Sequence, residues 1–212
     1  MVASGWWVVA AAAAGLGVGA AASTATRSFV SLKRRWARSG WFGAALTGVV
    51  FAVLAWRLAG RGELVAFGLA AGVAIPLGII DWCEHRLPRV LAWPQLGATA
   101  LALASVALVR NTPEPGLRAL AAAAAAMVFF LLLALASGGG VGAGDLPAAG
   151  LVGLVTGWID WPHVAGALIA ASVLALVVAV PARQHRTHPG PATVPFGPFL
   201  FCGALLMVLV GA

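Results

Sequence analysis

Residues 137–145 read Ser-Gly-Gly-Gly-Val-Gly-Ala-Gly-Asp, and they end an apolar run that covers residues 120–136. A carboxylate at membrane depth costs roughly 2.5–3.5 kcal/mol, so an acid at the edge of such a run indicates a functional site with a partner group. The candidate partner of Asp145 is Asp81, which closes a second apolar run over residues 64–80. The two stretches together predict membrane-spanning helices that carry a pair of aspartates.

The composition of the 212 residues is that of an integral membrane protein. Hydrophobic residues make up 62% of the chain and charged residues only 9%, and the mean hydropathy is +1.00. This leaves too little polar surface for a soluble globular domain. The net charge of +7 lies mostly in short loops between apolar runs. Anionic lipid and membrane topology account for it there, so the expected partner is the lipid bilayer and no nucleic acid is expected.

A helix needs roughly 20 apolar residues to cross a bilayer, and on this measure the chain contains eight hydrophobic segments. The segments are approximately 5–24, 40–58, 63–81, 90–109, 117–137, 147–158, 163–181 and 195–211. The sixth segment is too short to span the membrane alone, which fits a short or broken piece after Gly142-Ala143-Gly144-Asp145 that is buried in protein. We therefore predict an all-α, polytopic membrane helix bundle, with residues 1–212 forming a single domain.

Basic residues divide unevenly between alternate loops, and the more positive side of a membrane protein is normally cytoplasmic. The nine on one side are Arg27, Lys33, Arg34, Arg35, Arg38, Arg86, Arg89, Arg183 and Arg186. The four on the other side are Arg57, Arg61, Arg110 and Arg118. This orientation puts the N-terminus outside and both Asp81 and Asp145 at cytoplasmic helix ends. The segment 5–24 has an alternative reading as a signal peptide, but it lacks a positively charged start.

Neither a metal nor a cofactor is expected. Cys83 and Cys202 lie far apart in the chain and form no Cys-x-x-Cys pair. The four histidines are scattered and have no spacing typical of a metal site. We interpret both cysteines as packing residues.

Two aspartates that approach closely cannot both ionise, so such a pair holds one proton at neutral pH. The ionised carboxylate then takes a proton from water while its protonated partner donates to a carbonyl, as in aspartic proteases. Gly142 and Gly144 would let the backbone pass close to the second acid and leave room for an extended peptide. We expect residues 138–144 and the short segment after them to form a mobile substrate gate, with a passive loop as the alternative. The plainer reading of both acids is that they are helix ends exposed to headgroup water.

Several motifs resemble those of the type IV prepilin peptidases, the Gly-x-Gly-Asp membrane aspartic peptidases. Asp81-Trp-Cys-Glu-His-Arg-Leu87-Pro88 is similar to their first aspartate motif, and Gly142-Ala143-Gly144-Asp145 to their second. Residues 153–158 resemble the Gly-x-x-x-Gly-Trp stretch that follows the second aspartate. Pro195-Phe196-Gly197-Pro198 resembles the start of the last helix in that family. The resemblance covers about residues 64–210.

The resemblance implies an aspartic endopeptidase of the inner (plasma) membrane, which serves type IV pilus assembly and protein secretion. Such enzymes cut the short basic leader from pilin-like precursor proteins at the cytoplasmic face, just before the apolar helix. The implied catalytic residues are Asp81 and Asp145. The residues implied in substrate contact or gating are Gly142, Gly144, Glu84, Leu87 and Pro88. Glu84 is a candidate for recognising the basic leader, and the oligomeric state is left open.

The chain departs from the family pattern in three respects. Pro147 replaces the lysine usual two residues after the second aspartate, and Arg89 replaces the acid or amide usual after Leu-Pro. The cysteine-rich cytoplasmic insertion of the longer bacterial members is missing, so we expect a cleavage-only enzyme without zinc or an S-adenosylmethionine site. Two alternatives remain open: a catalytically impaired scaffold for pilus assembly, motivated by Pro147, and a proton-coupled transporter that uses the paired acids.

Overall fold

The computed structural model describes residues 5–31, 35–58, 60–136, 142, 144–184 and 195–211, and these residues form helices without a strand. The helices are α1 (Gly5–Ala25), α2 (Arg35–Arg38), α3 (Trp41–Leu58), α4 (Glu63–Glu84), α5 (Arg89–Arg110), α6 (Pro113–Ala136), α7 (Asp145–Ile159), α8 (Trp161–Gln184) and α9 (Gly197–Gly211), with a short 3-10 turn, η1 (Arg27–Phe29), after α1.

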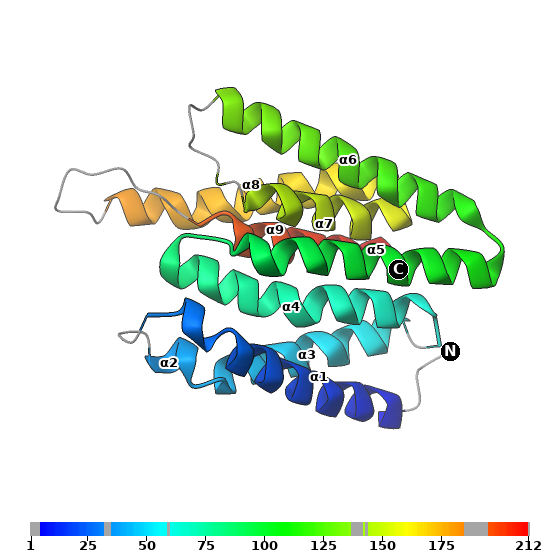
Figure 1. Ribbon diagram of the computed structural model, residues 1–212, viewed down its shortest axis with the longest axis horizontal. Coiled ribbons are helices and arrows are strands. Elements are labelled where there is room, and N and C mark those ends of the chain that lie inside the picture. The colour runs from blue at the N-terminus through cyan, green and yellow to red at the C-terminus, as the bar shows by residue number, and fades with distance from the viewer. Residues whose placement is uncertain are drawn as a thin grey trace.

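Six of these helices, α1, α3, α4, α5, α6 and α8, are long and apolar enough to cross a membrane, and α7 and α9 are shorter apolar helices. The prediction of an all-α bundle with about eight hydrophobic segments is therefore confirmed. Successive apolar helices run in opposite directions (Figure 1). We call the end where α4 ends and α5, α7 and α9 begin the motif end, and the opposite end the far end.

The two groups of basic residues separate along this axis, as far as they are described. Members of the larger group lie in or beside connections at the motif end: Arg27, Arg35, Arg38, Arg86, Arg89 and Arg183. The smaller group lies at the far end: Arg57, Arg61, Arg110 and Arg118. The charge asymmetry read from the sequence is thus an asymmetry between the two ends of the bundle.

Helix α7 lies inside the bundle, where every residue from Pro147 to Trp158 is buried. Its 15 residues extend about 22 Å, less than the roughly 30 Å of a hydrocarbon core. Glycines on α7 allow close packing against the alanine-rich α6, because a Cβ at Gly157 would lie 3.3 Å from the Cα of Ala119. The short sixth segment is therefore confirmed. It begins at Asp145 itself, so the acid belongs to the first turn of the helix.

The far end is fastened by buried polar contacts. Glu63, only 7% exposed, accepts hydrogen bonds from Arg110 on both carboxylate oxygens, the Nη2 to Oε2 distance being 2.7 Å. Nε1 of Trp158 lies 3.4 Å from Oε1 of the same carboxylate. Arg118 donates to the three carbonyls of residues 157–159 that end α7. These bonds satisfy groups that would otherwise be buried without partners.

Candidate active site

Asp81 lies in the last full turn of α4 and is 5% exposed. Its Oδ2 accepts the backbone N–H of Gly197, the first residue of α9, at 2.9 Å. A Cβ at position 197 would lie 2.7 Å from the same oxygen. This is closer than real Cβ atoms approach, so a glycine is required if the α9 backbone is to reach the carboxylate.

Asp145 is the first residue of α7, and its Oδ2 accepts the backbone N–H of Gly142 at 2.9 Å. Its own N–H donates to the Gly142 carbonyl, also at 2.9 Å, so the two residues close a tight turn. The start of a helix has free N–H groups and a positive dipole end, both of which favour a carboxylate. The turn formed by the Gly-x-Gly-Asp stretch therefore holds Asp145 at the N-terminus of α7.

Leu87 connects the surroundings of the two acids. It is buried, and its carbonyl oxygen and Cβ lie so close to Gly144 that a side chain at that position would overlap them. The Cδ1 of Leu87 would lie 3.1 Å from a Cβ at Gly197, the residue that binds Asp81. One side chain thus packs between the glycine before Asp145 and the glycine that holds Asp81.

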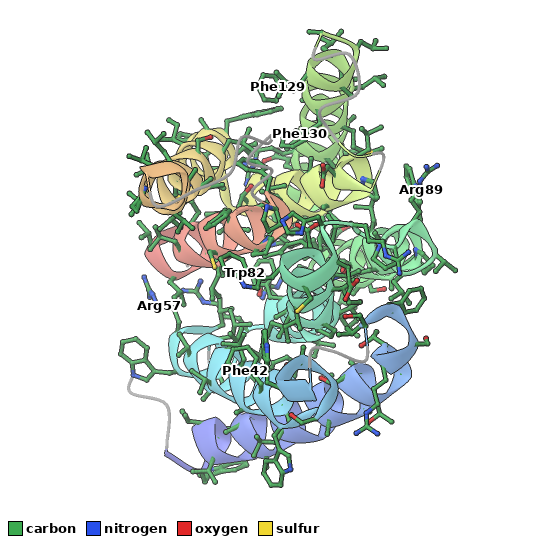
Figure 2. The ribbon with its side chains drawn as sticks, turned by 90° about the vertical axis from the view of Figure 1, so that its left-hand side faces the viewer. Phe42, Arg57, Trp82, Arg89, Phe129 and Phe130 are labelled. Atoms are coloured by element: carbon green, nitrogen blue, oxygen red, sulfur yellow. The ribbon has the colours of Figure 1, made fainter. Side chains whose placement is uncertain are left out.

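The turn that presents Leu87 is set by its neighbours. His85 adopts a left-handed conformation with φ of 52° and ends α4, and its N–H donates to the carbonyl of Asp81 at 2.8 Å. Pro88 is extended and caps α5, which begins at Arg89. A residue before proline avoids the helical conformation, so Leu-Pro both stops α4 from continuing and starts α5. Arg89 is exposed and labelled in Figure 2.

The motif end brings the two acids together although 64 positions separate them in the chain. Leu87 packs against the glycines beside both acids, so the two carboxyl groups lie in one neighbourhood of the bundle. Within the described part of the chain, each uses Oδ2 for a backbone N–H at the start of a short helix. This leaves Oδ1 of each carboxyl for water or substrate, an arrangement suited to general acid–base chemistry.

The other predicted site residues lie around this pair. Glu84 ends α4 at the edge of the site, and its Oε1 accepts the N–H of Ser31 at 2.8 Å. Pro147 is buried in the first turn of α7, where a missing N–H costs no intrahelical bond. Of the predicted gate, most of residues 138–144, including Gly138, lie outside the described residues, while Gly142 and Gly144 belong to the turn described above.

Gly197 contacts Asp81 in the structure, and the sequence alone assigns it no role. Its stretch, Pro195-Phe196-Gly197-Pro198, offers only a similarity at the start of the last helix. The usable signal was a glycine between prolines at a helix start, where the backbone needs room. Aromatic side chains on both sides of Gly197 in the chain pack against other helices. The ring centroids of Phe196 and Phe130 are 6.0 Å apart, and those of Phe199 and Trp82 are 6.2 Å apart.

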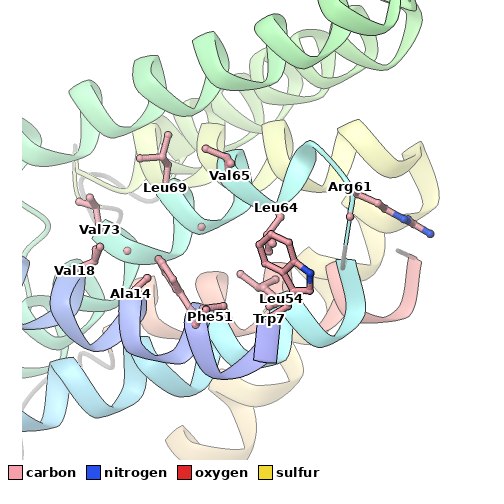
Figure 3. Close-up of a pocket in the computed structure, with 16 residues that line it drawn as sticks. Trp7, Ala14, Val18, Phe51, Leu54, Arg61, Leu64, Val65, Leu69 and Val73 are labelled. Atoms are coloured by element: carbon pink, nitrogen blue, oxygen red, sulfur yellow. The ribbon is translucent and has the colours of Figure 1, made fainter. Parts of the chain in front are cut away.

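Two apolar cavities lie in the described part of the bundle, and neither is lined by Asp81 or Asp145. One of about 620 Å³ lies between α1, α3 and α4, and Figure 3 shows Arg61 extending away from its other labelled side chains. A second of about 160 Å³ is lined by α3, α4, α7 and α9. Among the described residues, no three His, Cys, Asp or Glu side chains are grouped so that they could hold a metal ion.

The six long apolar helices place the chain in the class of multi-pass membrane proteins. The sequence profile of the type IV leader peptidase family matches residues 68–180, more than half of the chain, and this match includes both Asp81 and Asp145. The chain therefore belongs to the type IV leader peptidase family. No curated protein and no solved structure shows a significant match. The matched region ends before α9, which supplies Gly197.

Proposed function

We propose that the protein is an aspartic endopeptidase in which Asp81 and Asp145 activate one water molecule. Membership of a peptidase family supports hydrolysis of peptide bonds. The observation that carries the assignment of residues is that both acids lie at the motif end, each held there by a backbone N–H beside the start of a short helix. Packing of Leu87 between Gly144 and Gly197 supports the same pairing.

In the proposed reaction one carboxyl is ionised and its partner carries the shared proton. The ionised carboxylate takes a proton from water as the water oxygen bonds to the carbonyl carbon of the scissile peptide. The protonated partner donates its proton to the carbonyl oxygen, which gives a neutral tetrahedral intermediate. When the intermediate collapses, the C–N bond breaks, the protonated carboxyl gives its proton to the leaving amine, and the ionised carboxylate takes a proton from one hydroxyl. The pair then again holds one proton. The backbone N–H groups of Gly142 and Gly197 keep the carboxyl groups in position.

The proposed substrate is a pilin-like precursor with a short basic leader followed by an apolar helix. The motif end carries the larger group of basic residues, which favours a cytoplasmic position for it in the inner membrane. The leader would then remain in water while the apolar helix lies in the bilayer beside Asp81. We propose that residues 1–212 act as one integral-membrane domain.

The test is direct. The purified protein, in detergent or lipid nanodiscs, is incubated with a synthetic precursor of this design, and mass spectrometry identifies the products. We expect a single cut between leader and helix by the wild-type protein, and cleavage slower by at least about a hundredfold with Asp81→Asn. A folded wild-type protein that binds the precursor without cutting it would favour the assembly scaffold, for which the absence of lysine at Pro147 is the specific observation.

A further inference from the structure

The apolar cleft of about 160 Å³ opens along the seam between α4 and α9. Its floor is formed by α4 and α7, and its walls by α3 and α9. On the α3 wall the cleft is lined by Leu46 and Val50, among others. On the α9 wall it is lined by Phe201 and Leu205, among others. At the far end, Arg57 of α3 donates through Nε to the Leu209 carbonyl of α9 at 2.9 Å, which ties the two walls together.

The cleft points toward the candidate active site. Ala74 of the cleft floor and Asp81 are seven positions apart on α4, which puts them on one helix face about 10 Å apart. Between them, Gly78 lies against α9, where a Cβ would be 3.6 Å from Cδ2 of Phe201. The same α4–α9 seam therefore runs from the cleft to the carboxylate. Figure 2, seen from the motif end, shows Arg57 and Trp82 on the side where α3 and α9 face each other.

We infer that this cleft is the docking surface for the apolar helix of the precursor whose leader is removed at Asp81 and Asp145. The inference rests on the proposed function and adds where the substrate lies. A helix that begins at the scissile bond must descend into the bilayer from the motif end, and the cleft continues from Asp81 in that direction. Alanines at positions 70, 71 and 74 line the α4 side of its floor, and small residues let helices approach closely within lipid.

The chain supplies its own probe, because Cys202 lines the cleft and is exposed whereas Cys83 is buried. Cys202 lies five residues into the chain from Gly197, or about 7.5 Å along α9. In the variant that combines Asp81→Asn with Cys83→Ser, precursors carrying one cysteine at successive helix positions are cross-linked with a short bismaleimide. We expect cross-linking to be strongest near the fifth residue after the cleavage site, to recur every three to four residues, and to disappear with Cys202→Ser.

Uniform cross-linking at all positions, or none to a precursor that is bound, would overturn the inference. Cross-linking of Cys202 between two copies of the protein, unaffected by the precursor, would assign the cleft to self-association and would also overturn it.

A second experiment measures the kinetics of Ala71→Leu, in which a larger side chain fills the floor of the cleft at a partly exposed position. We expect KM for the full precursor to rise roughly tenfold, equal to about 1.4 kcal/mol. Cleavage of a peptide that lacks most of the apolar helix should not change. Ala125→Leu, at an exposed position of α6, is the matched control and should behave as wild type.

The two proposals fail separately. If the wild-type protein cuts the precursor and Ala71→Leu leaves KM unchanged, the docking surface is wrong and the proposed function stands. If no precursor is cut but cross-linking follows the helical pattern, the docking surface stands and the peptidase activity is wrong.

Discussion

Gly197 donates its backbone N–H to Oδ2 of Asp81 at 2.9 Å, across 116 positions of sequence. The contact leaves no room for a side chain at position 197, since a Cβ there would lie 2.7 Å from the carboxylate oxygen. The orientation of the first aspartate is therefore set by the last helix of the bundle. In the proposed mechanism Gly197 is a positioning residue rather than a catalytic one.

Replacing Gly197 by alanine should displace Asp81 and lower kcat by roughly ten- to a hundredfold, because small errors in the placement of a catalytic group are costly. KM should change little, since the variant retains the docking surface. Gly97→Ala is the control, because no atom lies within 4 Å of a Cβ added there. Equal kcat values for Gly197→Ala and Gly97→Ala would remove the positioning role.

Asp81→Asn and Asp145→Asn should each reduce cleavage by about a hundredfold to ten-thousandfold, the usual contribution of general acid–base catalysis. Asparagine keeps the shape and accepts the same backbone N–H, so the variants should remain folded. Thermal unfolding in detergent checks the fold and product analysis checks the activity. Asp160→Asn, at the far end, should cleave normally. Wild-type activity in either aspartate variant would exclude the pair as the catalytic group.

Gly144→Ala should be more damaging than Gly142→Ala. A side chain at position 144 would overlap the carbonyl of Leu87, whereas a Cβ at position 142 would lie 3.3 Å from Oδ2 of Asp145. We expect Gly144→Ala to lose both activity and thermal stability, and Gly142→Ala to lose mainly activity. Gly17→Ala on α1, which meets no neighbour, serves as the control. A larger loss in Gly142→Ala than in Gly144→Ala would show that the contact between Leu87 and Gly144 does not determine activity or stability.

Glu84→Gln separates charge from hydrogen bonding. The amide oxygen can still accept the N–H of Ser31, so the link from α4 to the chain after η1 is kept while the negative charge is lost. If Glu84 recognises the basic leader, KM should rise severalfold with little change in kcat, and the rise should shrink at high salt. An unchanged KM for precursors with basic and with neutral leaders would leave Glu84 a structural role only.

Breaking the far-end contacts should affect stability and not catalysis. Glu63→Gln weakens the paired bonds from Arg110 and should lower the free energy of unfolding by about 1–3 kcal/mol, the usual value for bonds to charged groups. The expected readout is a lower Tm in detergent with normal kcat for the folded fraction. A loss of kcat at unchanged Tm would indicate that the two ends of the bundle communicate.

The sequence was sufficient for the helices, because long apolar runs permit few alternatives in a membrane. The short segment after Asp145 was also predictable, since its length alone excludes an independent span. The helix begins at Asp145, two residues before the predicted start at Pro147. In the structure this proline lies in the first helical turn, where it is tolerated.

The sequence predicts the two aspartates as a pair because intramembrane acids are rare and both follow apolar runs, and their catalytic role stays a prediction. The contacts that hold them were not predictable, since backbone N–H groups have no sequence signature. Gly197 binds Asp81 because α9 packs beside α4, and the local sequence around either residue does not predict this long-range packing. Glu84 illustrates the same limit: its hydrogen bond to Ser31 depends on the path of a distant connection.

The last helix begins at the residue that holds Asp81, and residues 185–196 separate it from α8. A chain divided between these helices would leave both aspartates on one piece and the donor to the first of them on the other. Neither piece alone would then contain a complete site, and hydrolysis would return only when the separate helix docked on the bundle. In such a divided protease, the amount of cleaved peptide would measure how often the separate helix associates with the other helices inside a bilayer.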